Sequence, residues 1–288
     1  EKYYRRFRLD IYSKIVSYKI ELPNTLSLVL GMRTASWLCF ILAGGLALLY
    51  LSQGYYPEFM SHFSNFFPPV ISGVAVVASF FALRKYWESL GSRLSRVWLC
   101  FTMGMIFWFL GELGWAFYTL VLNVEKPYPS VADAFWLIGY VPLFIALYVY
   151  VQTFKPAVSK HMLRIAGGAT FLASLLIIFT LIPPIMAAAE DPLIGVVDLA
   201  YPTLDVLLFA IALLGLLIFT ASKLKGKMET AWLLINAGIF MNVVGDVLFS
   251  YTTLTGTYWN LPAHPLELFF HGGYILFLLA FYTHMKEL

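Results

Sequence analysis

Charged residues are scarce in this chain of 288 residues, at 12% of the sequence, whereas hydrophobic residues make up 60%. The mean hydropathy of +0.78 excludes an ordinary soluble globular domain. The only two cysteines, Cys39 and Cys100, both fall within apolar runs, which excludes a disulfide framework. The sequence also has no phosphate-binding glycine loop, no serine nucleophile elbow and no lysine inside a span that could anchor retinal.

What the sequence has instead is a series of eight apolar runs. A bilayer core of roughly 30 Å needs about 20 such residues per helix, so we predict an all-α integral membrane protein with eight transmembrane helices. The predicted spans are Thr34–Leu51, Phe66–Leu83, Val97–Leu122, Val131–Val151, Leu163–Ile185, Ala200–Ala221, Thr230–Leu254 and Pro265–His284.

Basic residues are distributed unevenly between the connections. All but one of the 19 Lys and Arg residues lie before the first span, in the even-numbered connections or near the C-terminus, and Lys126 is the exception. Cytoplasmic loops retain basic residues, so we expect a plasma-membrane protein with both termini in the cytoplasm. The net charge of +3 reflects this bias and does not suggest a nucleic-acid partner.

Residues 1–33 precede the first span and combine basic and apolar positions. Tyr4, Phe7, Ile11 and Ile15 recur at helical spacing. This pattern predicts a cytoplasmic amphipathic helix that lies in the membrane interface, with a basic tail that orders only on lipid as the alternative. The chain begins at Glu1 rather than Met, so we expect a portion of a longer protein.

The chain matches itself, without a gap, at an offset of 134 residues. Two tandem four-helix repeats, 34–152 and 153–288, are therefore predicted. Because each repeat has an even number of spans, both halves run in the same direction, related by a pseudo-twofold axis along the membrane normal. The offset pairs Trp98 with Trp232, Gly111 with Gly245, Glu112 with Asp246, Asp133 with Glu267, and Tyr140 with Tyr274.

Two of these pairs are acids inside apolar segments, where ionisable side chains are costly and usually functional. The second repeat adds polar groups nearby: Asn242 shares a helix face with Asp246, and His271 follows Glu267 on another helix. A small-molecule or lipid pocket in the outer half of the second repeat is one interpretation, and acids that only hydrogen-bond between helices are another. The predicted ligand-binding residues are Asp205, Asn242, Asp246, Glu267, His271, Tyr274, Glu112 and Asp133.

A third interpretation is a zinc site made by His264, Glu267, His271 and Asp246. Histidine and carboxylate are usual zinc ligands, and a zinc-bound water could hydrolyse an amide or ester. The spacing H-x-x-E-x-x-x-H is not the H-E-x-x-H arrangement of metalloproteases.

Three segments carry a resemblance to a known family. They are Tyr128-Pro-Ser-Val-Ala-Asp133-Ala-Phe-Trp-Leu-Ile-Gly139-Tyr140, Asp198-Leu-Ala-Tyr-Pro202-Thr-Leu-Asp205 and Gly245-Asp246-Val-Leu-Phe-Ser-Tyr251. The region from about Phe66 to Tyr282 resembles the multi-helix membrane region at the N-terminus of bacterial GGDEF and EAL signalling proteins, which make or degrade cyclic di-GMP. The resemblance implies a sensory input module followed by a cytoplasmic output domain. The sequence up to Leu288 holds no such domain, so we expect either an output domain on a longer chain or a separate partner, or a stand-alone relative whose role differs.

The favoured hypothesis is thus a ligand-sensing membrane module whose partners are membrane lipids, a small-molecule or lipid ligand, a cytoplasmic output domain and, as a further option, a second copy in a homodimer. An intramembrane zinc-dependent hydrolase of a lipid-like substrate is the alternative. A small-solute transporter is third, because the inner halves of the spans are nearly all apolar and offer no polar route.

Overall fold

The computed structural model describes residues 25–89, 91–124, 128–153, 158–187, 192–221 and 227–287, with side chains from Trp37 onward. The chain divides into the unit Glu1–Trp37 and a compact unit, Leu38–Leu288. In the first unit the described residues, from Thr25, begin one helix, and all packing below belongs to the second unit. The predicted interfacial helix before Thr25 lies outside the described residues.

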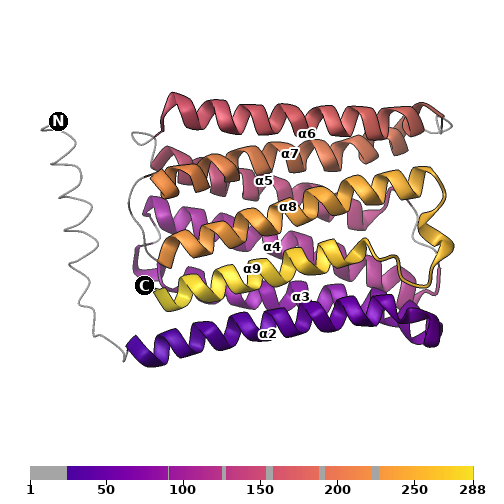
Figure 1. The fold of residues 1–288 in the computed structure, drawn as a ribbon, viewed down its shortest axis with the longest axis horizontal. Helices are drawn as coiled ribbons and strands as arrows, with labels where there is room; N and C mark the ends of the chain where they lie inside the picture. Colours follow the sequence, from indigo (N-terminus) through magenta and orange to yellow (C-terminus); the bar gives the residue numbers. More distant parts are fainter. Residues whose placement is uncertain are drawn as a thin grey trace, which may run out of the picture. The chain divides into compact units, whose positions relative to one another are not determined.

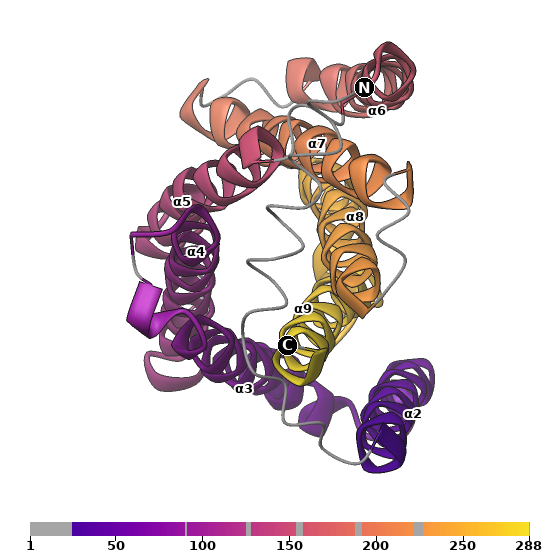
Figure 2. The ribbon, with the colours of Figure 1, turned by 90° about the vertical axis from the view of Figure 1, so that its left-hand side faces the viewer.

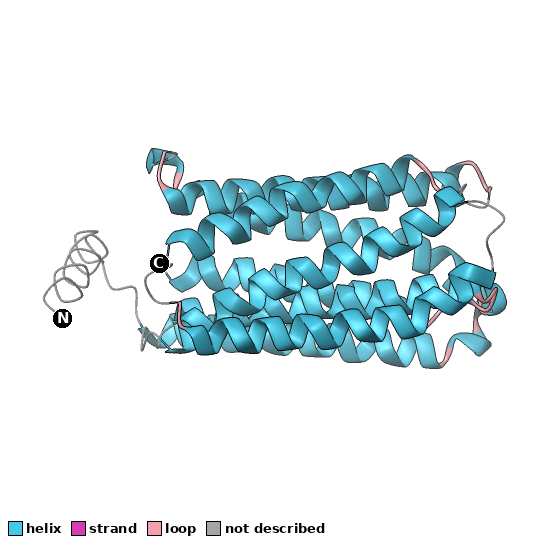
Figure 3. Ribbon diagram, turned by 90° about the horizontal axis from the view of Figure 1, so that it is seen from above, coloured by secondary structure: helices cyan, strands magenta, loops and turns pink. Residues whose placement is uncertain are grey.

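Every regular element in the described part of the chain is helical (Figures 1 and 3). The long helices are α2 (Thr25–Leu51), α3 (Pro57–Arg84), α4 (Arg93–Ala116), α5 (Val131–Thr153), α6 (Lys160–Ala187), α7 (Pro192–Ala221), α8 (Lys227–Leu254) and α9 (Glu267–Glu287). α4 continues into a π-helical turn, Phe117–Val121. Short 3-10 turns lie at Gln53–Tyr55, Trp87–Ser89 and Tyr258–Asn260.

Seven of these helices, α3 to α9, are long and apolar enough to cross a membrane. The part of α2 with described side chains, Trp37–Leu51, is an apolar stretch shorter than a full span. Length and composition therefore indicate a multi-pass membrane protein, as the apolar runs predict.

Three helices begin at least eight residues earlier than the apolar runs predict, and α2 is the first of them, at Thr25 rather than Thr34. α3 begins at Pro57 rather than Phe66, and α7 begins at Pro192 rather than Ala200. A proline in the first turn loses no hydrogen bond, because the first amides of a helix have no partner within it. The added turns are less apolar, with Glu58 in the first turn of α3. Hydropathy marks depth in the membrane, whereas the helix ends are set by backbone hydrogen bonds.

Six helices form a closed ring when the compact unit is viewed end-on (Figure 2). The order around the ring is α3, α4, α5, α7, α8 and α9, and α9 packs against α3 to close it. α6 lies outside the ring against α7 and α8. Each ring helix therefore has one face toward the centre, where side chains from sequence-distant helices meet.

The end of the ring near the C-terminus is filled by aromatic side chains. Trp98 of α4 contacts Phe281 of α9 with ring centroids 5.9 Å apart, and Phe101 of α4 contacts Trp232 of α8 at 6.1 Å. These four side chains are at most 2% exposed. They close this half of the bundle by contacts across the ring, and the polar side chains discussed next gather in the other half.

Candidate functional site

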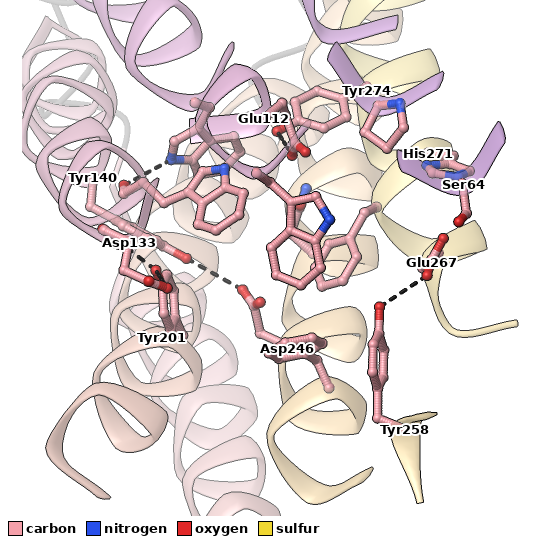
Figure 4. A pocket seen from close by; sticks show the side chains of 17 residues that line it. Ser64, Glu112, Asp133, Tyr140, Tyr201, Asp246, Tyr258, Glu267, His271 and Tyr274 are labelled. Atoms are coloured by element: carbon pink, nitrogen blue, oxygen red, sulfur yellow. Dashed lines mark hydrogen bonds between the residues drawn. The ribbon is translucent and has the colours of Figure 1, made fainter. Parts of the chain in front are cut away.

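A cavity of about 120 Å³ lies inside the ring, in the half away from the C-terminus. Figure 4 shows the side chains that line it. That volume holds several water molecules or a small ligand. α3, α4, α5, α7, α8 and α9 all contribute to its wall. The lining residues are Ser64, Pro68, Trp108, Glu112, Trp115, Asp133, Trp136, Tyr140, Tyr201, Asn242, Asp246, Phe249, Tyr258, Glu267, Phe270, His271 and Tyr274.

Glu112 and Asp246 are each approached by a tyrosine from the other half of the chain. The Tyr274 hydroxyl donates to Glu112 Oε1 at 2.8 Å, which joins α9 to α4. The Tyr140 hydroxyl lies 3.5 Å from Asp246 Oδ2, between α5 and α8. Its shorter bond, at 2.6 Å, goes to Asp205 Oδ1. The contact of the Tyr140 hydroxyl with Asp246 is therefore weaker than its hydrogen bond to Asp205, because hydrogen bonds weaken steeply beyond about 3.2 Å.

Asp133 is held by a capping box at the start of α5. Its Oδ2 atom accepts from the Ser130 amide at 2.6 Å, and Ser130 Oγ accepts from the Ala132 amide at 3.2 Å. This reciprocal pattern satisfies amides that have no partner within the helix. Asp133 Oδ1 also accepts from the Tyr201 hydroxyl at 3.0 Å. Asp133 therefore orders the beginning of α5 while it lines the cavity.

Glu267, at the start of α9, is held by two phenol groups. Tyr50 of α2 donates to Oε2 at 2.7 Å, and Tyr258, in the loop before α9, donates to Oε1 at 2.9 Å. The Tyr50 oxygen also lies 2.8 Å from His271 Nε2. Burial raises the pKa of Tyr258 well above its ordinary value, and the Glu267 carboxyl raises it further. Tyr258 therefore remains a protonated donor.

Aromatic rings form much of the remaining wall. Trp108 donates from Nε1 to the Trp136 carbonyl at 3.2 Å, and Trp115 donates to Asn65 Oδ1 at 2.6 Å. These bonds orient the indole rings of α4 between α3 and α5. Indoles whose N–H groups are used in this way present ring surface to the cavity.

Seven of the eight predicted ligand-binding residues line this one cavity. The exception is Asp205, which lies behind Tyr140 and is 0% exposed. The location differs from the prediction, because both halves of the chain build the wall rather than the second repeat alone. Helix faces could be read from the sequence, but the closure of the ring that brings Glu112 and Asp133 to the same cavity could not.

Sequence reasoning named Tyr274 but missed the other tyrosines that donate to the acids and the tryptophans between them. Tyr201, inside a segment that carries the family resemblance, and Tyr258, in the loop before α9, both contact predicted acids. The signal that could have found Asp133's capping role was Ser130 three residues before it. The tyrosine pairings between distant segments left no local signal.

The predicted zinc site is not formed. Within the described residues, no three His, Cys, Asp or Glu side chains lie close enough to share a metal ion. His264 Nδ1 instead accepts from the Leu266 amide at 3.3 Å and so caps α9, while Tyr50 and Tyr258 occupy both oxygens of Glu267. Asp246 faces Tyr140 rather than His271. The four predicted zinc ligands thus share a helix face or a similar depth in the membrane, but their side chains do not meet at one point.

Comparison with protein-family models, with curated proteins and with solved structures yields no match. The site's own chemistry is therefore the basis for assigning a function: a partly polar cavity of acids, phenols and indoles at the junction of six apolar helices.

Proposed function

We propose that this protein is a membrane-embedded sensor that binds a small ligand in the cavity and passes a signal to its cytoplasmic end. The observation that carries the proposal is that the hydrogen bonds at the cavity join distant helices. Tyr274 on α9 bonds to Glu112 on α4, and Tyr140 on α5 approaches Asp246 on α8. A ligand that engages either acid competes with a tyrosine, and so alters the packing between the halves.

The signal has a direct route along α9. Glu267, His271 and Tyr274 line the cavity near the beginning of this helix. The same helix runs to Glu287 at the end of the bundle where the C-terminus lies (Figure 1). A ligand shifts the equilibrium between two packings of the helices only if it binds one packing more tightly than the other. Breaking a tyrosine bond to Glu112 or Asp246 provides that difference in affinity.

The proposal includes eight spans in two tandem parallel repeats, with α2 as the first span. The contact pattern supports this: α3–α4–α5 and α7–α8–α9 follow the same order around the ring, and α5 meets α7 as α9 meets α3. Side-chain contacts repeat at the 134 offset too. Trp98 stacks on His284 with centroids 3.9 Å apart, and Trp232 stacks on Tyr150 at 3.5 Å.

The proposed orientation puts both termini in the cytoplasm and the cavity near the outer surface. The turns at the C-terminal end of the bundle carry Arg84, Lys85, Arg93 and Lys160, in keeping with the positive-inside rule. The resemblance to GGDEF and EAL membrane regions agrees with an output domain on that side.

Transport is less favoured, because aromatic contacts such as Trp98 with Phe281 fill the end of the ring near the C-terminus. A hydrolase that uses His264, Glu267, His271 and Asp246 together is less favoured too, since these side chains have separate partners.

The test is to fill the cavity and look for a lost ligand. Ser64 lines the cavity and is 6% exposed, whereas Ser61, one turn earlier on α3, is exposed. Small molecules extracted from purified wild type, Ser64→Phe and Ser61→Phe are compared by mass spectrometry. We expect a compound retained by wild type and Ser61→Phe and absent from Ser64→Phe. Equal retention by all three, or no compound retained by any, contradicts the proposal.

A further inference from the structure

The cavity is lined by acidic side chains and by no Lys or Arg in the described part of the chain. The acidic side chains are those of Glu112, Asp133, Asp246 and Glu267. Carboxyl groups in an apolar bundle favour any group that brings positive charge, because the low dielectric strengthens the attraction. An anionic ligand is disfavoured by the same carboxyl groups.

The aromatic rings point to an organic rather than an inorganic cation. Trp108, Trp115 and Trp136 lie on one side of the cavity, and Tyr140 and Tyr274 lie nearby. A cation near an aromatic face is attracted by the ring quadrupole, and apolar groups attached to the cation gain contact area. A bare metal ion needs several oxygen or nitrogen ligands at one point, which the described His, Cys, Asp and Glu side chains do not provide.

His271 supplies a hydrogen-bond acceptor. It lines the cavity, is 1% exposed, and its Nδ1 atom has no hydrogen-bond partner among the described residues. When Tyr50 donates its one proton to Glu267, His271 Nε2 is the donor to the Tyr50 oxygen. A neutral imidazole that donates from Nε2 accepts at Nδ1. The carboxyl oxygens of Asp246, a lining residue, likewise accept from N–H groups, so the wall suits a ligand that carries N–H donors.

We propose that the cavity binds a small organic ammonium ion with at least one N–H group. The inference rests on the proposed sensor function and names the chemical class of its ligand. The ammonium group lies near Asp246, and its carbon atoms lie against the indole rings. A free amine and the ethanolamine headgroup of a lipid share this chemistry.

The first test compares three probes of similar size. Full-length protein in phosphatidylglycerol nanodiscs is titrated at constant ionic strength with tert-butylammonium chloride, tert-butanol or tetramethylammonium chloride, and binding is followed by tryptophan fluorescence. We expect tert-butylammonium to bind most tightly, because it alone has both the charge and the N–H donors. Equal binding of tert-butanol, or tighter binding of tetramethylammonium, overturns the proposal.

Variants locate the binding. Asp246→Asn is expected to weaken tert-butylammonium binding about tenfold or more, the effect of losing a hydrogen bond to a charged group. Glu58→Gln removes the same charge from an exposed position at the same end of the bundle and is expected to bind as wild type does. A thermal unfolding transition shows that each variant is folded, and the probe comparison in wild type needs no variant. Unchanged binding by folded Asp246→Asn contradicts the inference.

Repeating the titration in nanodiscs that contain a second lipid distinguishes the two sources of the ammonium group. If phosphatidylethanolamine in the nanodisc abolishes probe binding, the ligand is the lipid headgroup, whereas unchanged probe binding identifies a free amine. The mass-spectrometric comparison of Ser64→Phe with Ser61→Phe tests the sensor function separately. A neutral or anionic compound lost only from Ser64→Phe overturns the ammonium inference and leaves the sensor proposal standing.

Discussion

Tyrosine hydroxyls are the groups that make buried acids tolerable in this bundle. Glu112 accepts from Tyr274, and Asp133 accepts from Tyr201. Glu267 accepts from two tyrosines. A buried carboxyl without such donors would lose the free energy of hydration with no compensation. Asp246 has a longer phenol contact, 3.5 Å from the Tyr140 hydroxyl, and shares a side-chain hydrogen bond with Asp205.

Removing one donor should therefore destabilise the bundle. We expect Tyr274→Phe to lower the free energy of unfolding by about 1–3 kcal/mol, because Glu112 then loses its phenol donor in a buried site. Tyr282→Phe, on the same helix, is the control, because the Tyr282 hydroxyl makes no hydrogen bond in the described part of the chain. Thermal unfolding in nanodiscs measures both. A Tyr274→Phe transition at the wild-type temperature would show that the bond contributes little.

Glu112→Gln provides a second residue-level comparison. A glutamine oxygen still accepts from Tyr274, so we expect a wild-type unfolding temperature. His271→Ala, in contrast, is expected to lose the retained ligand while the protein stays folded, because it removes the free acceptor in the cavity wall. Ligand retention and thermal stability are measured on the same samples. If Glu112→Gln loses the ligand and His271→Ala retains it, the ligand binds beside α4 rather than beside α9.

Helix pairs approach most closely where glycines face each other. A Cβ atom at Gly139 of α5 would lie 2.5 Å from Trp108 Cδ1 and 3.3 Å from the Gly104 carbonyl oxygen of α4. A Cβ atom at Gly273 of α9 would meet Asn242 of α8 at 2.6 Å. Small residues allow this close approach, which orients Trp108 and Asn242 at the cavity.

Gly139→Ala should therefore strain the α4–α5 pair. We expect a loss of about 1–3 kcal/mol in unfolding free energy, the usual effect of overpacking, and a changed tryptophan emission because Trp108 must move. Gly167→Ala on α6 is the matched control, since a Cβ atom there has nothing within 4 Å. Equal stabilities of the two variants would argue against the tight crossing.

The beginning of α9 depends on a neutral histidine. Burial lowers the pKa of His264 below its ordinary value of 6.5, and its Nδ1 atom accepts from the Leu266 amide. Because the unfolded chain binds the proton more readily, the contribution of His264 to stability is fully present above about pH 6.5. It is lost as the pH falls through the lower folded-state pKa.

We therefore expect thermal stability to fall on acidification below pH 6.5 by more in wild type than in His264→Ser. Serine caps α5 at Ser130 in the same way and does not titrate in this range. Unfolding temperatures measured between about pH 5 and pH 8 give the comparison. Parallel pH profiles for the two proteins would indicate that other groups control the acid response.

At the scale of the whole molecule, the two ends of the bundle differ. One end carries the cavity, and the other carries the aromatic contacts, the basic turns and the C-terminus. Ring closure through α5–α7 and α9–α3 makes the cavity a property of both halves, so movement of one half against the other changes its shape.

Labelling in intact cells tests the orientation. In a background without Cys39 and Cys100, Gly54→Cys should react with an impermeant maleimide from outside, whereas Gly91→Cys should react only after permeabilisation. A Cβ atom added at either glycine would meet no other atom within 4 Å, whereas Gly256 has a φ of +69° that disfavours any residue but glycine. Labelling of Gly91→Cys in intact cells reverses the topology.

The sequence by itself determined the helices and the residues worth attention. Apolar runs are a local property, so they predicted the helices of the bundle, with the largest errors at the beginnings of α2, α3 and α7. The 134 offset and the cost of intramembrane charge singled out Glu112, Asp133, Asp246 and Glu267.

Only the tertiary structure decided that these acids share one cavity and which groups they bond. Contacts such as Tyr274 with Glu112, 162 residues apart, depend on how each helix is rotated and on the closure of the ring. Spacing along one helix gives a face but not the side chain opposite that face. The zinc prediction for His264, Glu267, His271 and Asp246 was wrong for this reason: residues at a similar depth on two helices have different neighbours once the helices pack.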